Sequence, residues 1–487
     1  MPDPYDPPRR RLRTVLLKAL VIGVVIVAAA AVGVVAIARH TTSADDQATP
    51  PGDTTGSAAP TELNVSSPPE PPAVLVPAGG SGAATLTAGE LRARLAPLLT
   101  SKRFGPSRLE YAYATLDGAK PLLTSGADDV VTPASTLKLL TTTTALAQLG
   151  PDARFDTTVV RVPGTRRLVL VGGGDPLLTD VARRPQVVDD YPREATLQDL
   201  AAQTAKALGA GTAPVTLTYD DSLFAGPAVN PQWQATYIPE SIVSPITALW
   251  VNEGRLTVGL AQRAADPSLA AARRFAQLLG RSGVKVAGQI RSTNAPTAAR
   301  QVAVVSSAPL AAIVEHTIEV SDNEAAEVLL RQAAIGAGRP GSFVGGVATV
   351  RATLRSLGVD LAGARIYDGS GLSRADRLPV WSLVQVLQAA ARADEPALRA
   401  ALTSLPVAGF NGSLAYRFST AEAGLGLVRA KTGTLTEAGV HGYAGLAMAA
   451  DGEPIVFATI ANAVPPRRAL AVRAQLDRIA AAVTTCC

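Results

Sequence analysis

Residues that commonly build disulfide frameworks and metal centres are scarce in this sequence. Its 487 residues include two cysteines and three histidines. Cys486 and Cys487 are adjacent at the C-terminus and cannot bridge distant parts of a fold, while the histidines lie far apart in the chain. This pattern points to neither a disulfide framework nor a histidine-rich metal site, and we expect no metal and no cofactor.

A basic stripe interleaved with aromatic residues is also missing. Aromatic residues make up 4% of the chain, and residues 1–18, with five basic and two acidic side chains, carry +3 of the net charge of +5. The remainder is nearly balanced, so we expect no nucleic acid partner. Apolar residues nonetheless make up 47% of the chain, which is enough for the cores of two or three domains and argues against global disorder.

One apolar run has the length needed to span a membrane. Residues 19–38 (ALVIGVVIVAAAAVGVVAIA) are uncharged, and about twenty such residues cross a bilayer as a helix. The basic cluster before this run predicts a cytoplasmic tail at residues 1–18 and an extracytoplasmic body. Export after cleavage of a signal peptide is the alternative, because small residues precede Arg39. Residues 39–85, rich in proline, serine, threonine and glycine, predict a flexible linker.

Helical and alternating patterns after this linker predict a globular α/β body. Its first strand is expected at residues 109–116, and three strands near the C-terminus form an antiparallel meander before a closing helix over residues 467–483. A sheet built from both chain ends would make the middle of the chain an insertion. We therefore predict a main domain at residues 86–152 and 304–487, with a strand-rich accessory region at residues 153–303.

A lysine inside a leucine-rich helical run is the first sign of chemistry. The chain has 38 arginines and only 7 lysines, and Lys138 follows Ser135 by three residues in TPASTLKLLTTTTAL. Residues three apart on a helix share a face. Burial among leucines lowers the pKa of an ammonium group, so a neutral amine can take the serine proton, which arginine cannot do. The pair predicts a serine nucleophile in the first turn of a helix, with the lysine as its base.

Ser-x-x-Lys is a weak pattern by itself. It occurs again at Ser282 and Lys285, where a glycine lies inside the pattern. This copy falls at the end of a helix predicted over residues 265–283, where no rigid shared face is expected. We interpret it as structural.

A second candidate element is SDNEAAEVLL, which begins at Ser321. A capping box would explain it without chemistry, since Ser321 could bond to the first helical turn and Glu324 could bond back. Capping does not explain Asn323, but Ser-x-Asn also occurs at residues 292–294. The element alone therefore leaves structure and function as alternatives.

The third element, RAKTGTL, is more specific because Lys-Thr-Gly occurs once in the chain. The expected strand carries Lys431, Thr432, Gly433 and Thr434. A lysine, two hydroxyl groups and a glycine form an edge that can pair with an extended ligand and bind its carboxylate. An ordinary exposed edge strand protected by its lysine is the alternative.

The order Ser-x-x-Lys, Ser-x-Asn, Lys-Thr-Gly resembles that of penicillin-binding proteins and serine β-lactamases. More narrowly, the chain resembles the class C low-molecular-mass penicillin-binding proteins, the D-alanyl-D-alanine carboxypeptidase/endopeptidase family. This likeness spans residues 87–484 and includes the interval of 186 residues between Ser135 and Ser321. It also rests on GGGDPLL at residues 172–178, DDSLFAGP at 220–227, PITALWVNEG at 245–254 and DGSGLSR at 368–374, the last expected to be a loop near the cleft.

The resemblance implies both a fold and an activity. The fold is the α/β penicillin-binding protein/serine β-lactamase-like fold, an antiparallel sheet flanked by helices with a helical subdomain, here carrying the inserted region. The activity is that of a serine DD-peptidase that cleaves peptidoglycan peptides ending in D-Ala-D-Ala and is acylated by β-lactams. The main domain then becomes the catalytic domain.

The resemblance also implies a set of roles in acylation. Ser135 is the acylated nucleophile, and Lys138 accepts its proton. Ser321 relays a proton to the leaving amine. The backbone amides of Ser135 and Thr434 form the oxyanion hole, usually the largest contribution to acyl transfer.

Substrate recognition follows from the same resemblance. Asn323 bonds to a substrate amide. The terminal carboxylate is recognised by Lys431, Thr432 and Thr434, and Lys431 also supports the proton network. Gly433 keeps the strand edge open.

Other functions stand as alternatives. A serine β-lactamase or a related esterase would share the nucleophile, and a cell-wall-binding protein or a β-lactam sensor would need no turnover. A Ser-His-Asp hydrolase is disfavoured because the chain has no Gly-x-Ser-x-Gly sequence. His441 is expected in the strand beside the Lys-Thr-Gly edge.

Overall fold

The computed structural model describes residues 86–126, 130–181 and 191–486. The predicted tail, membrane-spanning run and linker, which together form residues 1–85, lie outside the described residues. Among the helices that are described, none combines the length and the apolar character needed to cross a bilayer.

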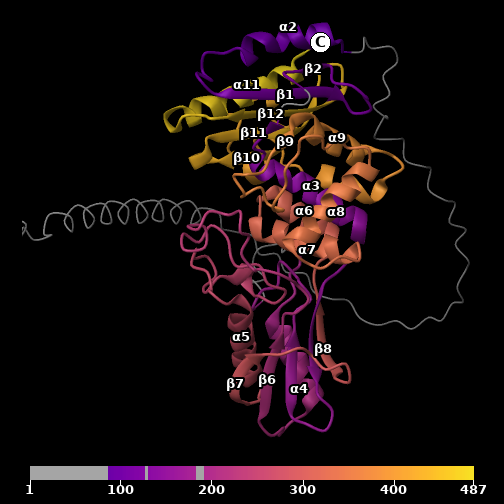
Figure 1. Cartoon of the computed structure of the whole chain (residues 1–487), viewed down its shortest axis with the longest axis vertical. Helices are drawn as coiled ribbons and strands as arrows, with labels where there is room; N and C mark the ends of the chain where they lie inside the picture. Colours follow the sequence, from indigo (N-terminus) through magenta and orange to yellow (C-terminus); the bar gives the residue numbers. More distant parts are fainter. Residues whose placement is uncertain (1–85, 127–129, 182–190, 487) are drawn as a thin grey trace, which may run out of the picture. The chain divides into compact units, whose positions relative to one another are not determined.

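A five-stranded sheet is assembled from both ends of the described chain (Figure 1). Three C-terminal strands form an antiparallel meander, and the last of them pairs antiparallel with the first strand of the body. The strand order is β10 (Val428–Leu435), β11 (Val440–Met448), β12 (Pro454–Asn462), β1 (Arg108–Thr115) and β2 (Leu123–Thr124). The structure therefore has the predicted sheet, with β10 at its edge.

The two faces of this sheet carry side chains of different size. On β1, Ala112 belongs to one buried cluster and the adjacent Tyr113 to another, because successive side chains of a strand point to opposite faces. Helices α2 (Ala88–Leu99) and α11 (Ala469–Thr484) pack on the tyrosine face. The small side chains of the other face let α9 (Val380–Ala391) approach. Figure 1 shows these helices on opposite sides of the sheet.

Helix α3 (Lys138–Leu149) lies inside a group of other helices. Every residue from 138 to 146 is buried, as expected for a helix with neighbours on all sides. Its side chains, Lys138 included, are therefore held by packing. The neighbouring helices are α6 (Leu310–Glu319), α7 (Asn323–Gly336), α8 (Phe343–Ser356), α9 and α10 (Arg399–Thr403).

A second five-stranded sheet occupies most of the stretch predicted as an insertion. Its order is β7 (Val286–Ser292), β6 (Val215–Asp220), β5 (Arg167–Val171), β4 (Asp156–Arg161) and β8 (Arg300–Ser306). Strands β5, β6 and β7 pair in parallel, and α4 (Leu197–Leu208) and α5 (Pro267–Arg281) provide the crossovers that parallel pairing needs. This sheet and its helices share a separate buried cluster. The domain limits at residues 153 and 303 stay a prediction.

Candidate active site

Ser135 lies in a 3-10 turn that leads directly into α3. The turn, η1 (Ala134–Leu137), ends where α3 begins at Lys138. The sequence had predicted that the serine lies in the first turn of the α-helix. It instead lies in the 3-10 turn just before that helix. The amide and hydroxyl of Thr136 both donate to the Pro133 carbonyl, at 3.3 and 2.7 Å. These bonds fix the bend, and the serine itself is half-buried.

The loop of residues 368–374 packs so closely on this turn that one of its positions must be glycine. A Cβ on Gly371, which has φ +80°, would lie 1.9 Å from the carbonyl oxygen of Ala134. Ala134 itself has φ +49°, an uncommon value for a residue with a side chain. The loop does lie beside the turn that carries Ser135, and it packs against that turn where the backbone has an unusual conformation.

The buried Lys138 amine has three oxygen neighbours. Its Nζ lies 3.0 Å from Ser135 Oγ, 2.8 Å from Asn323 Oδ1 and 2.8 Å from the Ser370 carbonyl oxygen. Burial lowers the pKa of Lys138 to about 8, although nearby carboxylates, with Glu327 foremost, oppose the shift. A neutral amine has two N–H groups and one lone pair. In this neutral form the amide and carbonyl oxygens, which can only accept, take the two N–H groups, and the lone pair faces the serine hydroxyl. In the ammonium form Lys138 donates to all three oxygens.

A second buried lysine contacts Ser321. Lys431 Nζ donates to Ser321 Oγ at 2.8 Å and to the Thr432 carbonyl at 2.9 Å. Burial lowers the pKa of Lys431 well below its usual value, and the charge of Lys138 acts in the same direction. The site therefore contains two lysines with lowered pKa, each within hydrogen-bond distance of a serine hydroxyl.

The capping-box interpretation of the Ser321 segment is wrong. Asp322 is the N-cap of α7, and its carboxylate accepts from the Ala325 amide at 2.9 Å. Glu324 instead forms a buried ion pair with Arg263 at 2.7 Å. Ser321 has φ +63°, in the left-handed region. The cap lies one residue later than expected, which leaves the serine hydroxyl to the buried lysine.

The Lys-Thr-Gly segment lies on the edge strand β10, as predicted. A Cβ on Gly433 would lie 2.7 Å from the Pro133 carbonyl oxygen, so the missing side chain lets the strand approach the nucleophile turn. Thr432 Oγ1 lies 3.1 Å from Ser413 Oγ, and the Thr434 side chain is exposed. The edge thus presents hydroxyl groups beside the two lysines.

The sequence analysis missed the groups that support Lys138. Glu327 on α7 accepts hydrogen bonds from the amides of Gly369 and Ser370, at 2.9 and 2.8 Å. It thereby holds the carbonyl that contacts the lysine. Burial raises the pKa of Glu327 to about 8, and the Asp368 carboxylate acts in the same direction. The one available signal was a glutamate inside the otherwise apolar run AAEVLL.

His441 has the position of a core residue. It is buried on β11, opposite Thr434 in the strand register, as expected from the sequence. Burial lowers the pKa of His441 to about 4, and Arg473 and Arg417 act in the same direction. This environment favours the neutral ring and gives no support to a Ser-His-Asp arrangement.

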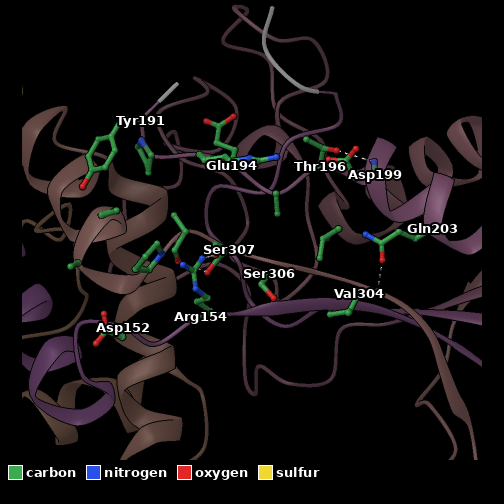
Figure 2. Close-up of a pocket in the computed structure, with 18 of the residues that line it drawn as sticks. Asp152, Arg154, Tyr191, Glu194, Thr196, Asp199, Gln203, Val304, Ser306 and Ser307 are labelled. Atoms are coloured by element: carbon green, nitrogen blue, oxygen red, sulfur yellow. Dashed lines mark hydrogen bonds between the residues drawn. The ribbon is translucent and has the colours of Figure 1, made fainter. Parts of the chain in front are cut away.

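Cavity size alone would have pointed to another part of the molecule. A cavity of about 940 Å³ is lined by residues such as Asp152, Glu194 and Ser307 (Figure 2). The smaller cavity, of about 550 Å³, is lined by Ser321 and Asn323. None of the eight residues predicted from the sequence lines the larger cavity, whereas these two line the smaller one.

Most of the chain matches one known protein family. Residues 91–265 and 256–483 match the D-Ala-D-Ala carboxypeptidase 3 (S13) family. The chain belongs to this family. It is 37% identical over 410 residues to a carboxypeptidase of Mycobacterium tuberculosis, covering 82% of this chain and 86% of the relative. It is 35% identical over 380 residues to carboxypeptidase DacB of Mycolicibacterium smegmatis, covering 76% and 79%. The predicted resemblance and the assignment as a serine-type peptidase are confirmed.

A solved structure shows the same fold. Penicillin binding protein 4 from Haemophilus influenzae matches with a TM-score of 0.64 at 21% identity, covering 81% of this chain and 98% of that chain. The chain therefore has the penicillin-binding protein/serine β-lactamase-like fold that the order of motifs predicted.

Proposed function

We propose that this protein is a serine D-Ala-D-Ala carboxypeptidase/endopeptidase that acts on peptidoglycan stem peptides through an acyl-enzyme and is acylated by β-lactams. The observation that carries the proposal is the environment of Lys138. Burial lowers the pKa of this amine to about 8, and in its neutral form the two oxygen acceptors engage its N–H groups, so that its lone pair faces Ser135 Oγ. Membership of the family supports the substrate class.

Acylation begins with proton transfer from Ser135 to Lys138. The serine oxygen attacks the carbonyl carbon of the penultimate D-alanine, and the resulting oxyanion is bound by the backbone amides of Ser135 and Thr434. Such preorganised donors are usually the largest source of transition-state stabilisation in acyl transfer. The close contact of Gly433 with the turn keeps these two amides on neighbouring segments.

Departure of the terminal D-alanine requires a proton on its nitrogen. Ser321 supplies this proton through its hydroxyl as the carbon–nitrogen bond breaks. Lys431, 2.8 Å from that hydroxyl, returns a proton to the Ser321 oxygen. The proton that Lys138 took from Ser135 then replaces the one that Lys431 gave, so that in total one proton passes from Ser135 to the leaving nitrogen and both amines return to their starting state. Water then hydrolyses the ester and regenerates the serine.

The edge of β10 recognises the end of the peptide. The terminal carboxylate is bound by Thr432, Thr434 and the Lys431 amine, while Asn323 donates from its amide nitrogen to a substrate carbonyl. The pKa of Lys431 is lowered before substrate binds. A carboxylate beside it favours the ammonium form, so substrate binding should raise this pKa and strengthen the charge that recognises the carboxylate.

Two substrates measured side by side test this function. We expect the enzyme to release D-alanine from an N-acylated D-Ala-D-Ala peptide with many turnovers, and to react with nitrocefin in a burst of about one equivalent followed by slow hydrolysis. Sustained nitrocefin hydrolysis without peptide turnover would identify a β-lactamase. Stoichiometric acylation without turnover of either substrate would identify a sensor, and turnover of simple esters alone an esterase. The rate at which the enzyme cleaves a cross-linked muropeptide dimer, compared with the rate of D-alanine release, measures its endopeptidase activity relative to its carboxypeptidase activity.

We also propose that residues 19–38 anchor the protein in the bacterial cell membrane, with the catalytic body outside. The length and apolar character of this run support the anchor. Mass spectrometry of the protein isolated from membranes tests it. An intact N-terminus is expected, whereas a chain that begins near residue 39 would show that a signal peptide had been removed.

A further inference from the structure

Three metal-binding side chains from separate segments meet beside the peptidase site. Glu253 lies in η2 (Asn252–Gly254), His316 lies on α6, and Asp322 caps α7. One possible ligand atom of each lies within 4.8 Å of the other two. All three line the cavity of about 550 Å³, which Ser321 also lines.

The hydrogen bonds of this group leave one carboxylate oxygen of Glu253 for another partner and join Asp322 to His316. Arg255 donates twice to Glu253, and both bonds, at 2.7 and 3.2 Å, go to Oε2. Asp322 uses Oδ1 to cap its helix, and its Oδ2 lies 3.2 Å from His316 Nε2. Ligand atoms around a tetrahedral zinc ion are about 3.3 Å apart, given metal–ligand distances of about 2.0 Å. The imidazole and carboxylate are already at this separation.

The charges around the cavity also favour a cation. Its wall carries three carboxylates and two arginines. Arg255 pairs with Glu253, and Arg263 pairs with Glu324. Asp322, which is 9% exposed, instead faces an imidazole. Buried carboxylates are found paired or bound to metal ions, and a cation at this point would contact the carboxylate that lacks an arginine.

We propose that Glu253, His316 and Asp322 form a binding site for one divalent transition-metal ion, with Zn²⁺ the best match. One imidazole nitrogen and two carboxylate oxygens are a donor set that zinc accepts, with a further position for water. Mg²⁺ and Ca²⁺ prefer oxygen ligands alone. This site was not predicted from the sequence, because its single histidine and two carboxylates come from positions up to 69 residues apart in the chain.

The site goes beyond the proposed peptidase reaction, none of whose steps uses an ion. Its position nevertheless connects it to that reaction, since Asp322 stands between Ser321 and Asn323. Ser321 contacts Lys431, and Asn323 contacts Lys138. A metal ion bound to Asp322 would fix the turn between α6 and α7 and thus the positions of both groups.

Zinc titration of the untagged full-length protein tests the proposal. After treatment with a chelator, isothermal titration calorimetry with ZnCl₂ should show one ion bound per chain, and MgCl₂ should give no comparable signal. His316→Gln and Glu253→Gln should each weaken zinc binding by about tenfold or more, because each removes one ligand. Thermal unfolding should shift upward with zinc in the wild type, by about 3 °C at a hundredfold excess over its Kd. At the same zinc concentration His316→Gln should shift by about 2 °C or less, because a tenfold weaker Kd leaves at most a tenfold excess.

Two controls isolate the site. Glu315→Gln removes a carboxylate from the same helix, one that accepts a hydrogen bond from Tyr191, and should leave zinc binding unchanged. Cys486 is disulfide-bonded, and the double variant Cys486→Ser, Cys487→Ser removes the thiols that reduction of this bond would expose to zinc. The single binding event should survive in that variant.

Three outcomes would overturn the proposal. They are the absence of saturable binding, binding that survives both ligand substitutions, and binding that disappears with the two cysteines. Unfolding of the variants in chelator verifies that they fold. Labelling with fluorescent penicillin reports the peptidase site separately, so a protein that labels but binds no zinc would refute this inference alone. One that binds zinc but does not label would refute the proposed function alone.

Discussion

Ser135 with Lys138 and Ser282 with Lys285 present the same four-residue pattern in two regions of the chain. In the first, the lysine is fully buried on α3 and lies 3.0 Å from the serine hydroxyl. In the second, Ser282 is the C-cap of α5, and its hydroxyl donates to the Leu278 carbonyl at 3.1 Å. Gly283, at φ +92°, then breaks the helix, and the lysine is exposed. The second copy is structural, as the sequence analysis had interpreted it.

The two Ser-x-Asn copies differ in the same way. Ser321 lies in the turn between α6 and α7 and Asn323 begins α7, and each contacts a buried lysine. Ser292 is the last residue of β7, and both it and Asn294 are exposed. A short pattern therefore acquires chemistry only where tertiary packing removes water and brings a partner from another segment.

The largest effect should come from exchanging the two serines for alanine in turn. Ser135→Ala should abolish covalent labelling by fluorescent penicillin, because it removes the nucleophile. Ser282→Ala should label at the wild-type rate. Gel fluorescence of both variants measures the difference, and labelling that persists in Ser135→Ala would reject the assignment of the nucleophile.

The lysines should differ almost as much. Lys138→Met should slow acylation by about a thousandfold, since general-base catalysis typically contributes a factor of 10² to 10⁴. Methionine keeps the apolar packing, so the loss reports the amine. The matched variant Lys285→Met should acylate normally in stopped-flow measurements with a fluorescent β-lactam. Equal acylation rates for the two variants would show that Lys138 is not the base and that the two Ser-x-x-Lys copies do not differ in function.

The asparagines provide a smaller contrast. Asn323→Ala should lower the acylation rate by about a hundredfold, because it removes one of the two acceptors that orient the Lys138 amine and a partner for the substrate. Asn294→Ala should change nothing. The comparison is made on kcat/KM for the D-Ala-D-Ala peptide, with thermal unfolding as the check on folding. A normal rate for Asn323→Ala would show that the Ser370 carbonyl alone is enough to orient the Lys138 amine.

The smallest expected effect is a shift of the pH profile. With the pKa of Lys138 at about 8, the acylation rate should fall tenfold per unit as pH decreases below that value, because the base becomes protonated. The Glu327 carboxylate favours the ammonium form and so raises this pKa. The pKa of Glu327 is itself raised to about 8, so its carboxylate is charged only in the upper part of this limb. Glu327→Gln should therefore move the upper end of the limb, near pH 8, to lower pH and leave the rate well below pH 7 on the same slope, while the lost acceptor for the Gly369 or Ser370 amide reduces the maximal rate by about tenfold. An upper end that stays in place or moves to higher pH would contradict the assigned role of the carboxylate.

Much of the fold could be predicted because its strands and helices follow local periodicity. The alternation in residues 109–116 and the C-terminal meander predicted a sheet from both chain ends, and β1 does pair with β12. The edge position of Lys431 followed from the same pattern. Details that depend on how segments meet were missed, such as the 3-10 turn under Ser135 and the shift of the helix cap from Ser321 to Asp322.

The supporting groups of the site could not be predicted for a related reason. Ser370 contacts Lys138 through its backbone carbonyl, which every residue type carries, so sequence letters give no signal. Glu253 and His316 come from segments 63 residues apart, and only the packing of the inserted region against α6 and α7 brings them together.

The amino-acid sequence by itself determined the strands and helices, the glycines required for close approach and the three groups of reactive residues, because these depend on side-chain chemistry and on spacing along the chain. The tertiary structure decided which copy of each pattern is functional. A pKa shift requires exclusion of water and an oriented lone pair requires acceptors on both sides, and both conditions come from segments that are distant in the sequence.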